Sequence, residues 1–204
     1  MSTKEIITIF FTIFIVIDPL GLIPVFIAYT AGYSRKEKPG IIVKAFFTAL
    51  FALVVFIVFG RDILTFLGIK PGSFYIAGGI LLFIVSLDLL FGHRQRTKVS
   101  EVSADGEDVS IFPLGIPTLA GPGTITTILL FVSESNNSFQ MELILFLAVL
   151  SSLLIAVLTM FLSGFFLKIF RKTGVSIIQR LMGIILSGLS VQFVYEGIAK
   201  LGLI

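Results

Sequence analysis

The sequence predicts an all-α protein that crosses a membrane six times, as two inverted halves of three spans each. Three observations predict this class. The mean hydropathy is +1.09, and only 13% of the 204 residues are charged, whereas about 25% is typical of soluble domains. Several apolar segments are long enough to cross a bilayer. Helix breakers interrupt the first and the fourth of these segments, so each half contains one broken helix.

A spanning helix needs about 20 mostly apolar residues. Six segments meet this requirement: 6–31, 41–60, 73–91, 111–132, 141–169 and 176–203. The most polar stretch, 93–110, separates the third segment from the fourth. It predicts a cytoplasmic loop that joins a first three-helix repeat, 1–92, to a second, 111–204.

Lysines and arginines set the expected orientation. The loops between segments one and two, three and four, and five and six carry most of them: Arg35, Lys36, Lys38, Lys44, Arg94, Arg96, Lys98, Lys168, Arg171, Lys172 and Arg180. The opposite side carries Lys4, Arg61, Lys70 and Lys200. Because cytoplasmic loops are enriched in these residues, we expect the three loops in the cytoplasm and both termini outside. The expected location is the cytoplasmic (inner) membrane.

The two halves also resemble each other in sequence. A shift of 104 residues places Gly79 on Gly183 and Ser86 on Ser190, and one further gap places Pro19 on Pro122. Since each half has an odd number of spans, the second half must enter the membrane from the opposite side. This is the inverted-topology repeat of several transporter folds. Within it, we expect Ser86, Ser190 and the glycines at 78, 79, 183 and 188 to serve close helix packing.

The first break is Asp18–Pro24. Aspartate is a preferred N-cap and proline favours the first turn, so Asp18 and Pro19 predict the start of a second half-helix near the middle of the bilayer. Gly21 permits close backbone approach, and Pro24 is expected to free a further carbonyl. Asp18 is the candidate coupling-ion residue: it can bind a cation or a substrate ammonium, carry a proton, or act only as a cap.

The second break is Pro117–Gly123. Pro117 disrupts the helix, Gly121 can leave helical geometry, and Pro122 restarts the helix with Gly123 behind it. Thr124 is the first of several threonines that follow, and its hydroxyl is a candidate ligand. Freed N–H groups at a half-helix N-terminus suit a carboxylate, and freed carbonyls suit an ammonium. The pair of breaks therefore predicts a site for a small zwitterion, while the alternative is two structural kinks.

Composition excludes other kinds of site. The chain has no cysteine and a single histidine, His93, in the polar loop, so neither a metal site nor a cofactor is predicted. No hydrolase motif is present, and the chain is not expected to be an enzyme. The net charge of +3 comes from short loops, so no nucleic-acid partner is expected, only the lipid bilayer and a small solute.

At both breaks the chain resembles the MarC family of integral membrane proteins, also called the neutral amino acid transporter family. The resemblance rests on DPLGLIPVF at 18–26 and PLGIPTLAGPGTI at 113–125. It implies a secondary transporter of small neutral amino acids such as glycine and alanine, coupled to a proton or sodium gradient. The implied substrate site is Asp18, Pro19, Gly21, Pro24, Pro117, Gly121, Pro122 and Gly123. A channel or exporter for another small polar solute is the alternative.

Overall fold

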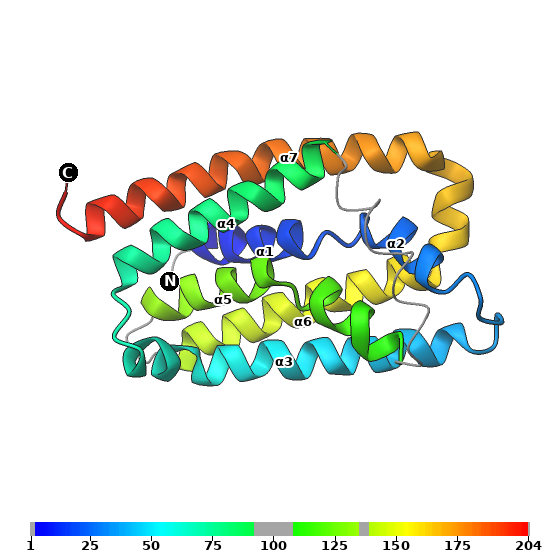
Figure 1. Cartoon of the computed structure of the whole chain (residues 1–204), viewed down its shortest axis with the longest axis horizontal. Helices are drawn as coiled ribbons and strands as arrows, with labels where there is room; N and C mark the ends of the chain where they lie inside the picture. The colour runs from blue at the N-terminus through cyan, green and yellow to red at the C-terminus, as the bar shows by residue number, and fades with distance from the viewer. Residues whose placement is uncertain (1–2, 92–107, 135–138, 204) are drawn as a thin grey trace.

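The computed structural model describes residues 3–91, 108–134 and 139–203, and the regular structure in these ranges is helical throughout. The helices are α1 (Thr3–Ile17), α2 (Leu22–Tyr29), α3 (Lys38–Phe66), α4 (Pro71–Phe91), η2 (Ser110–Leu119, a wide π-type coil), α5 (Pro122–Glu134), α6 (Phe139–Phe161) and α7 (Ser163–Lys200). They form an elongated bundle (Figure 1). The predicted all-α class is confirmed for this part of the chain.

The described residues contain five candidate membrane spans, or six if η2 and α5 count as one bent span. One candidate covers α1 and α2 together, Thr3–Tyr29, and the η2–α5 pair is bent by 50°. Most of the predicted loop 93–110 lies outside the described residues. The first four apolar segments of the sequence thus correspond to α1 with α2, to α3, to α4, and to η2 with α5.

The boundary between the last two segments differs from the prediction. Helix α6 ends at Phe161, well before 169, and α7 begins at Ser163, inside the fifth predicted segment. The basic stretch expected to be a loop is helical. Lysine and arginine are good helix formers, and none of the seven prolines follows Pro122, so no proline terminates the helix there. The part of α7 that is apolar enough to span a membrane is Thr173–Lys200.

Helices α4 and α7 run antiparallel along a seam of small residues (Figure 1). These residues recur at intervals of seven: Gly72, Gly79 and Ser86 on α4, and Gly183, Ser190 and Gly197 on α7. A Cβ on Gly79 would lie 2.7 Å from the Ser190 carbonyl oxygen, and one on Gly183 would lie 3.0 Å from that of Ser86. Only glycine permits this approach, so the packing predicted for Gly79 and Gly183 is confirmed.

The hydroxyls of this seam are satisfied within their own helices. Ser86 donates to the carbonyl of Phe83 and Ser190 to that of Ser187, both at 2.7 Å. Gly78 packs against the Thr126 methyl group on α5, as expected. The packing prediction for Gly188 is wrong, because no described atom lies within 4 Å of a Cβ placed there.

Helix α5 lies inside the bundle, where α1, α3 and α4 all contact it. Every residue from 127 to 132 is buried. The outer helices show the opposite pattern: Phe47, Phe51 and Phe59 of α3 are all exposed. A surface of large apolar side chains suits contact with lipid. The backbone directly before α5, at Ala120 and Gly121, is buried in this interior, which is where a membrane protein tolerates irregular backbone. The irregular residues Phe112 and Ile116 of η2 have exposed side chains.

Candidate functional site

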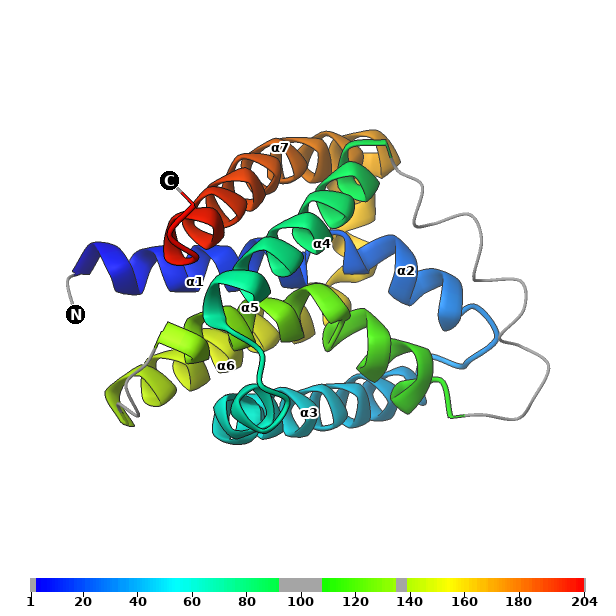
Figure 2. The same ribbon diagram turned by 60° about the vertical axis from the view of Figure 1, so that its left-hand side comes forward.

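The two interruptions of the helical chain lie side by side, about midway along the bundle (Figures 1 and 2). Helix α1 ends at Ile17 and α2 begins at Leu22, while η2 ends at Leu119 and α5 begins at Pro122. A Cβ on Gly123 would lie 3.1 Å from Cγ1 of Val16, two residues before Asp18. The structure thus brings together the two breaks that the sequence singles out.

Asp18 forms the turn of the first interruption. Its φ is 50°, a left-handed conformation that aspartate tolerates better than most residues. The Asp18 carbonyl accepts a hydrogen bond from the Leu22 N–H at 3.2 Å, and carboxylate oxygen Oδ1 accepts one from the Gly21 N–H at 3.0 Å. The carboxylate therefore satisfies a backbone N–H in the turn that leads into α2, as a capping residue does, while the N-cap position of α2 itself is Gly21.

The second carboxylate oxygen of Asp18 faces α7. Gln179 Nε2 donates to Asp18 Oδ2 at 3.4 Å, across 161 residues of sequence. Gly21 makes this arrangement possible, because a Cβ there would lie 1.8 Å from Oδ2 and 2.5 Å from the Gln179 nitrogen. Asp18 is half-buried, so its carboxylate sits in a tight, partly solvated setting between the first segment and α7.

Pro19 and Pro24 differ in their surroundings. Pro19 is buried, and its carbonyl accepts a hydrogen bond from the Thr159 hydroxyl of α6 at 2.8 Å. Pro24 is the third residue of α2, where no intrahelical N–H bond is lost. The carbonyl that Pro24 was expected to free, that of Leu20, accepts from the Ile23 N–H at 3.2 Å. That detail of the prediction is therefore wrong.

The second interruption is formed by backbone hydrogen bonds and by glycines that allow close approach of the chain to itself. The Ala120 N–H donates to the Gly115 carbonyl at 2.9 Å, and α5 starts with Ile125 N–H donating to the Gly121 carbonyl at 3.0 Å. A Cβ on Gly121 would lie 2.7 Å from the Pro117 carbonyl oxygen, so the chain is folded tightly back on itself. Gly121 is buried, Pro117 is half-buried, and Pro122, at the first helical position, is exposed.

The first turn of α5 presents backbone donors. The first N–H groups of a helix have no partner within it, and here they belong to Gly123 and Thr124, because Pro122 has none. Gly123 and the Thr124 side chain are buried. The Thr127 hydroxyl donates to the Gly123 carbonyl at 2.9 Å and is therefore already engaged. The N-terminal end of α5 carries positive dipole character toward the Val16 end of α1.

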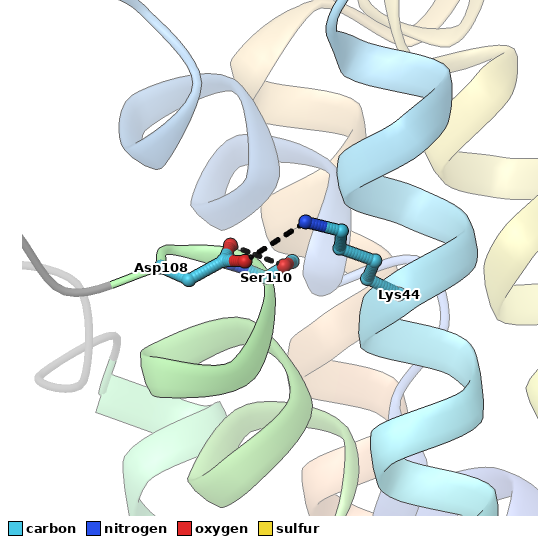
Figure 3. A network of polar contacts seen from close by, with 3 residues as sticks. All are labelled: Lys44, Asp108 and Ser110. Atoms are coloured by element: carbon cyan, nitrogen blue, oxygen red, sulfur yellow. Dashed lines mark hydrogen bonds and ion pairs between the residues drawn. The ribbon is translucent and has the colours of Figure 1, made fainter.

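A separate polar network fixes the start of η2 to α3 (Figure 3). Lys44 Nζ lies 3.1 Å from Asp108 Oδ2, and the Ser110 N–H donates to Asp108 Oδ1 at 3.0 Å. The Ser110 hydroxyl also donates to Oδ1. These hydrogen bonds from Ser110, followed by Lys44, lower the pKa of Asp108 below its ordinary value. Both ion-pair partners are well exposed.

Sequence reasoning missed Gln179 and Thr159. A weak signal existed for Gln179, which is an uncharged polar residue near the start of a spanning segment, between Ile178 and Arg180. Thr159 carries no such signal, because threonine is common in membrane helices. Among the residues that the structure describes, no three His, Asp or Glu side chains gather as a metal site would require.

Comparison with known proteins decides the family. The model of the MarC family integral membrane proteins matches residues 3–201. The chain belongs to the MarC family. The family resemblance seen at the two breaks is thereby confirmed over nearly the whole chain.

Curated relatives match this chain over nearly the full length of both proteins. A UPF0056 membrane protein of Methanocaldococcus jannaschii is 36% identical over 201 residues, which cover 97% of this chain and 98% of that protein. One of Aquifex aeolicus is 35% identical over 196 residues, covering 94% and 91%. One of Buchnera aphidicola is 31% identical over 195 residues, covering 96% of both. No solved structure matches the chain.

Proposed function

We propose that this MarC-family chain is a secondary active transporter of small neutral amino acids, such as glycine and alanine, driven by a proton or sodium gradient across the cytoplasmic membrane. One observation carries the proposal: two interrupted segments meet midway along the bundle, one with a carboxylate and the other with the N-terminal end of a helix. Paired interruptions of this kind are the usual place of substrate sites in transporters with internal repeats.

A zwitterion needs groups of both signs, and the two interruptions offer them. The Asp18 carboxylate suits an ammonium group. The N–H groups of Gly123 and Thr124, with the dipole of α5, suit a carboxylate. The glycines at 21, 121 and 123 allow close packing around the two interruptions, because a side chain at any of them would meet neighbouring atoms. A site bounded in this way favours the smallest amino acids.

The described conformation is closed at this place. An added methyl group at Gly21, Gly121 or Gly123 would already meet atoms at 1.8, 2.7 and 3.1 Å. A ligand must therefore be admitted by movement of the helices, which alternating access supplies. Asp18 is our coupling residue, because its charge would change with protonation or be balanced by a bound sodium ion.

The seam between α4 and α7 supports an inverted repeat of 3+3 spans. Gly79 packs on the backbone of Ser190, and Gly183 packs on that of Ser86. The shift of 104 residues relates Gly79 to Gly183 and Ser86 to Ser190, so each of these two contacts is the counterpart of the other. A two-fold relation between the halves would produce this exchange, and such repeats exchange conformations in alternating access. The cation distribution supports placing both termini outside.

Uptake into proteoliposomes tests the proposal. Labelled glycine and alanine are supplied under an imposed sodium or proton gradient, with wild type compared with Asp18→Asn. Asparagine is also a good N-cap, so this substitution removes the charge and keeps the cap. We expect saturable uptake driven by one gradient, reduced about tenfold or more in the variant, on the scale of a lost charge-assisted hydrogen bond.

Asp62→Asn is the matched control, because Asp62 is an exposed carboxylate near the far end of α3. It should transport like wild type. Absence of uptake by folded protein under either gradient contradicts the amino acid proposal. Uptake that does not saturate and ignores both gradients indicates a channel instead.

A further inference from the structure

The two oxygens of the Asp18 carboxylate accept hydrogen bonds of unequal length. Oδ1 accepts from the Gly21 N–H at 3.0 Å, within the same turn of the chain. Oδ2 accepts from Gln179 Nε2 at 3.4 Å, whereas N–H···O hydrogen bonds usually span about 2.7–3.2 Å. The hydrogen bond at Oδ1 therefore belongs to the turn itself, and the one at Oδ2 is the weaker of the two and the easier to exchange.

The hydrogen bond at Oδ2 joins the first interruption to α7. Gln179 is half-buried and lies in the part of α7 that is apolar enough to span a membrane, Thr173–Lys200. Toward α6, the same interruption is held by the Thr159 hydroxyl, which donates to the Pro19 carbonyl at 2.8 Å. That hydrogen bond is buried and of ordinary length, and α1 also packs more extensively on α6 than on α7. The first interruption is therefore attached more firmly to α6 than to α7.

Helix α7 packs chiefly on α4. Its contact with α4 is far more extensive than its contacts with α1, α2 or α6. Gly183, one helical turn after Gln179, packs on the backbone of Ser86 in α4, where an added Cβ would lie 3.0 Å from the carbonyl oxygen. Loss of the hydrogen bond from Gln179 therefore weakens the attachment of a helix pair, α4 with α7, to the first interruption.

Charge and space limit what can replace the glutamine amide on Asp18. The amide is neutral, whereas an ammonium group would bring the charge opposite to that of the carboxylate. Hydrogen bonds between an ammonium and a carboxylate are about 2.7–2.9 Å long and are among the strong ones in proteins. The space is narrow, because a Cβ on Gly21 would lie only 2.5 Å from Gln179 Nε2. A small primary ammonium is therefore favoured over the amide at Oδ2.

We infer that Gln179 is a positioning residue, which holds Asp18 Oδ2 in the closed conformation until the ammonium group of the substrate replaces its amide there. This inference rests on the proposed transport of small amino acids and names the side chain with which the substrate competes. A ligand shifts a conformational equilibrium only by interacting differently with the two conformations. Exchange of amide for ammonium supplies such a difference, because it breaks the hydrogen bond between α7 and the first interruption.

A lysine at position 179 tests the exchange without any substrate. Gln179→Lys brings an ammonium group to Oδ2 from α7 itself. It should raise the thermal unfolding temperature of the full chain in detergent, and it should not do so when combined with Asp18→Asn. In proteoliposomes, Gln179→Lys should take up glycine about tenfold or more slowly, on the scale of one charge-assisted hydrogen bond, because the place of the substrate ammonium is filled.

Gln192→Lys is the matched control. Gln192 is an exposed glutamine of α7, and its amide donates to Glu196 of the same helix at 2.9 Å. A lysine there should change the unfolding temperature equally with and without Asp18→Asn, and it should leave glycine uptake unchanged.

Gln179→Ala tests the exchange during transport. Removal of the amide removes the competitor of the substrate, so KM for glycine should fall about fivefold, the scale of an ordinary hydrogen bond. A purely structural role of Gln179 predicts the opposite, because a distorted site raises KM. Gln192→Ala should leave KM unchanged.

The outcomes separate this inference from the proposed function. Absence of uptake by folded wild type overturns the transport proposal, while the unfolding temperatures of the lysine variants still decide whether Asp18 Oδ2 prefers an ammonium to the amide. Stabilisation by Gln179→Lys that is absent, or that persists in Asp18→Asn, shows that the inference is wrong. So does a KM for glycine that is unchanged or raised in Gln179→Ala, with the variant folded by circular dichroism.

Discussion

The two interruptions lie side by side, yet they are built in different ways. At the first, Asp18 turns the chain, and side chains from distant helices complete it: Gln179 reaches the carboxylate and Thr159 reaches the Pro19 carbonyl. At the second, glycines and prolines fold the backbone on itself, with Gly121 against the Pro117 carbonyl. One interruption presents a negative side chain, and the other presents backbone N–H groups.

This difference teaches that two interruptions which meet in space can offer unlike chemistry, one from a side chain and one from the backbone. The first interruption depends on side-chain partners, so it should be sensitive to the loss of single polar groups. The second depends on the absence of side chains, so it should be sensitive to added volume. Gly21 combines both kinds of sensitivity, because the absence of a side chain there leaves room for the Asp18 carboxylate.

Gly21→Ala should have the largest effect. Its Cβ would lie 1.8 Å from Asp18 Oδ2 and would displace the carboxylate from both partners. Forced overpacking costs about 1–3 kcal/mol or more, so a clear drop in the thermal unfolding temperature by circular dichroism is expected. Gly188→Ala is the control, since no described atom lies within 4 Å of its Cβ. Equal unfolding temperatures would contradict the described packing at Gly21.

Gly121→Ala should be more harmful than Gly123→Ala. A methyl group at Gly121 meets a backbone oxygen at 2.7 Å, whereas one at Gly123 meets a side-chain methyl of Val16 at 3.1 Å, which can shift. We expect about 1–3 kcal/mol for the first and less than about 1 kcal/mol for the second. Chemical denaturation in detergent measures both. The opposite order would show that the second interruption is not closed at Gly121.

Thr159→Val should have a moderate effect that acts on the first interruption only. It keeps the shape of the side chain and removes the hydroxyl that donates to the Pro19 carbonyl. Leaving that buried carbonyl without its partner costs about 1–3 kcal/mol. Ser151→Ala on the same helix is the comparison, because the Ser151 hydroxyl bonds only to α6 carbonyls. A destabilisation no greater than that of Ser151→Ala would show that the Thr159 hydroxyl does not stabilise the first interruption.

The Lys44–Asp108 ion pair should matter least. Exposed pairs contribute about 0–1 kcal/mol, and these side chains are 65% and 41% exposed. Because folding lowers the pKa of Asp108, its contribution is present above the ordinary aspartate pKa and is lost as the pH falls through the lowered value. The stability difference between wild type and Asp108→Asn should therefore shrink in acid. A difference that grows in acid would contradict this sign.

Local features of the sequence were readable, and distant partners were not. Hydropathy and length located the apolar segments, and prolines and glycines located the ends of α1 and η2, because these signals act within a few residues. Gln179 and Thr159 meet the first interruption from 161 and 140 residues away, and no local pattern encodes such a meeting. The basic stretch before Thr173 suggested a loop because of its charges, although the structure places it within α7.

A disulfide between the interruptions tests the central claim most directly. The chain has no cysteine, so Val16→Cys with Gly123→Cys introduces a single pair, and a disulfide forms only if the Cα atoms lie within about 7 Å. Val16→Cys with Ser133→Cys is the control, about 15 Å further along α5. We predict that oxidation joins only the first pair, stops glycine uptake in proteoliposomes, and is reversed by reductant. Failure of that pair to form, or undiminished uptake by the crosslinked protein, would contradict a shared substrate site.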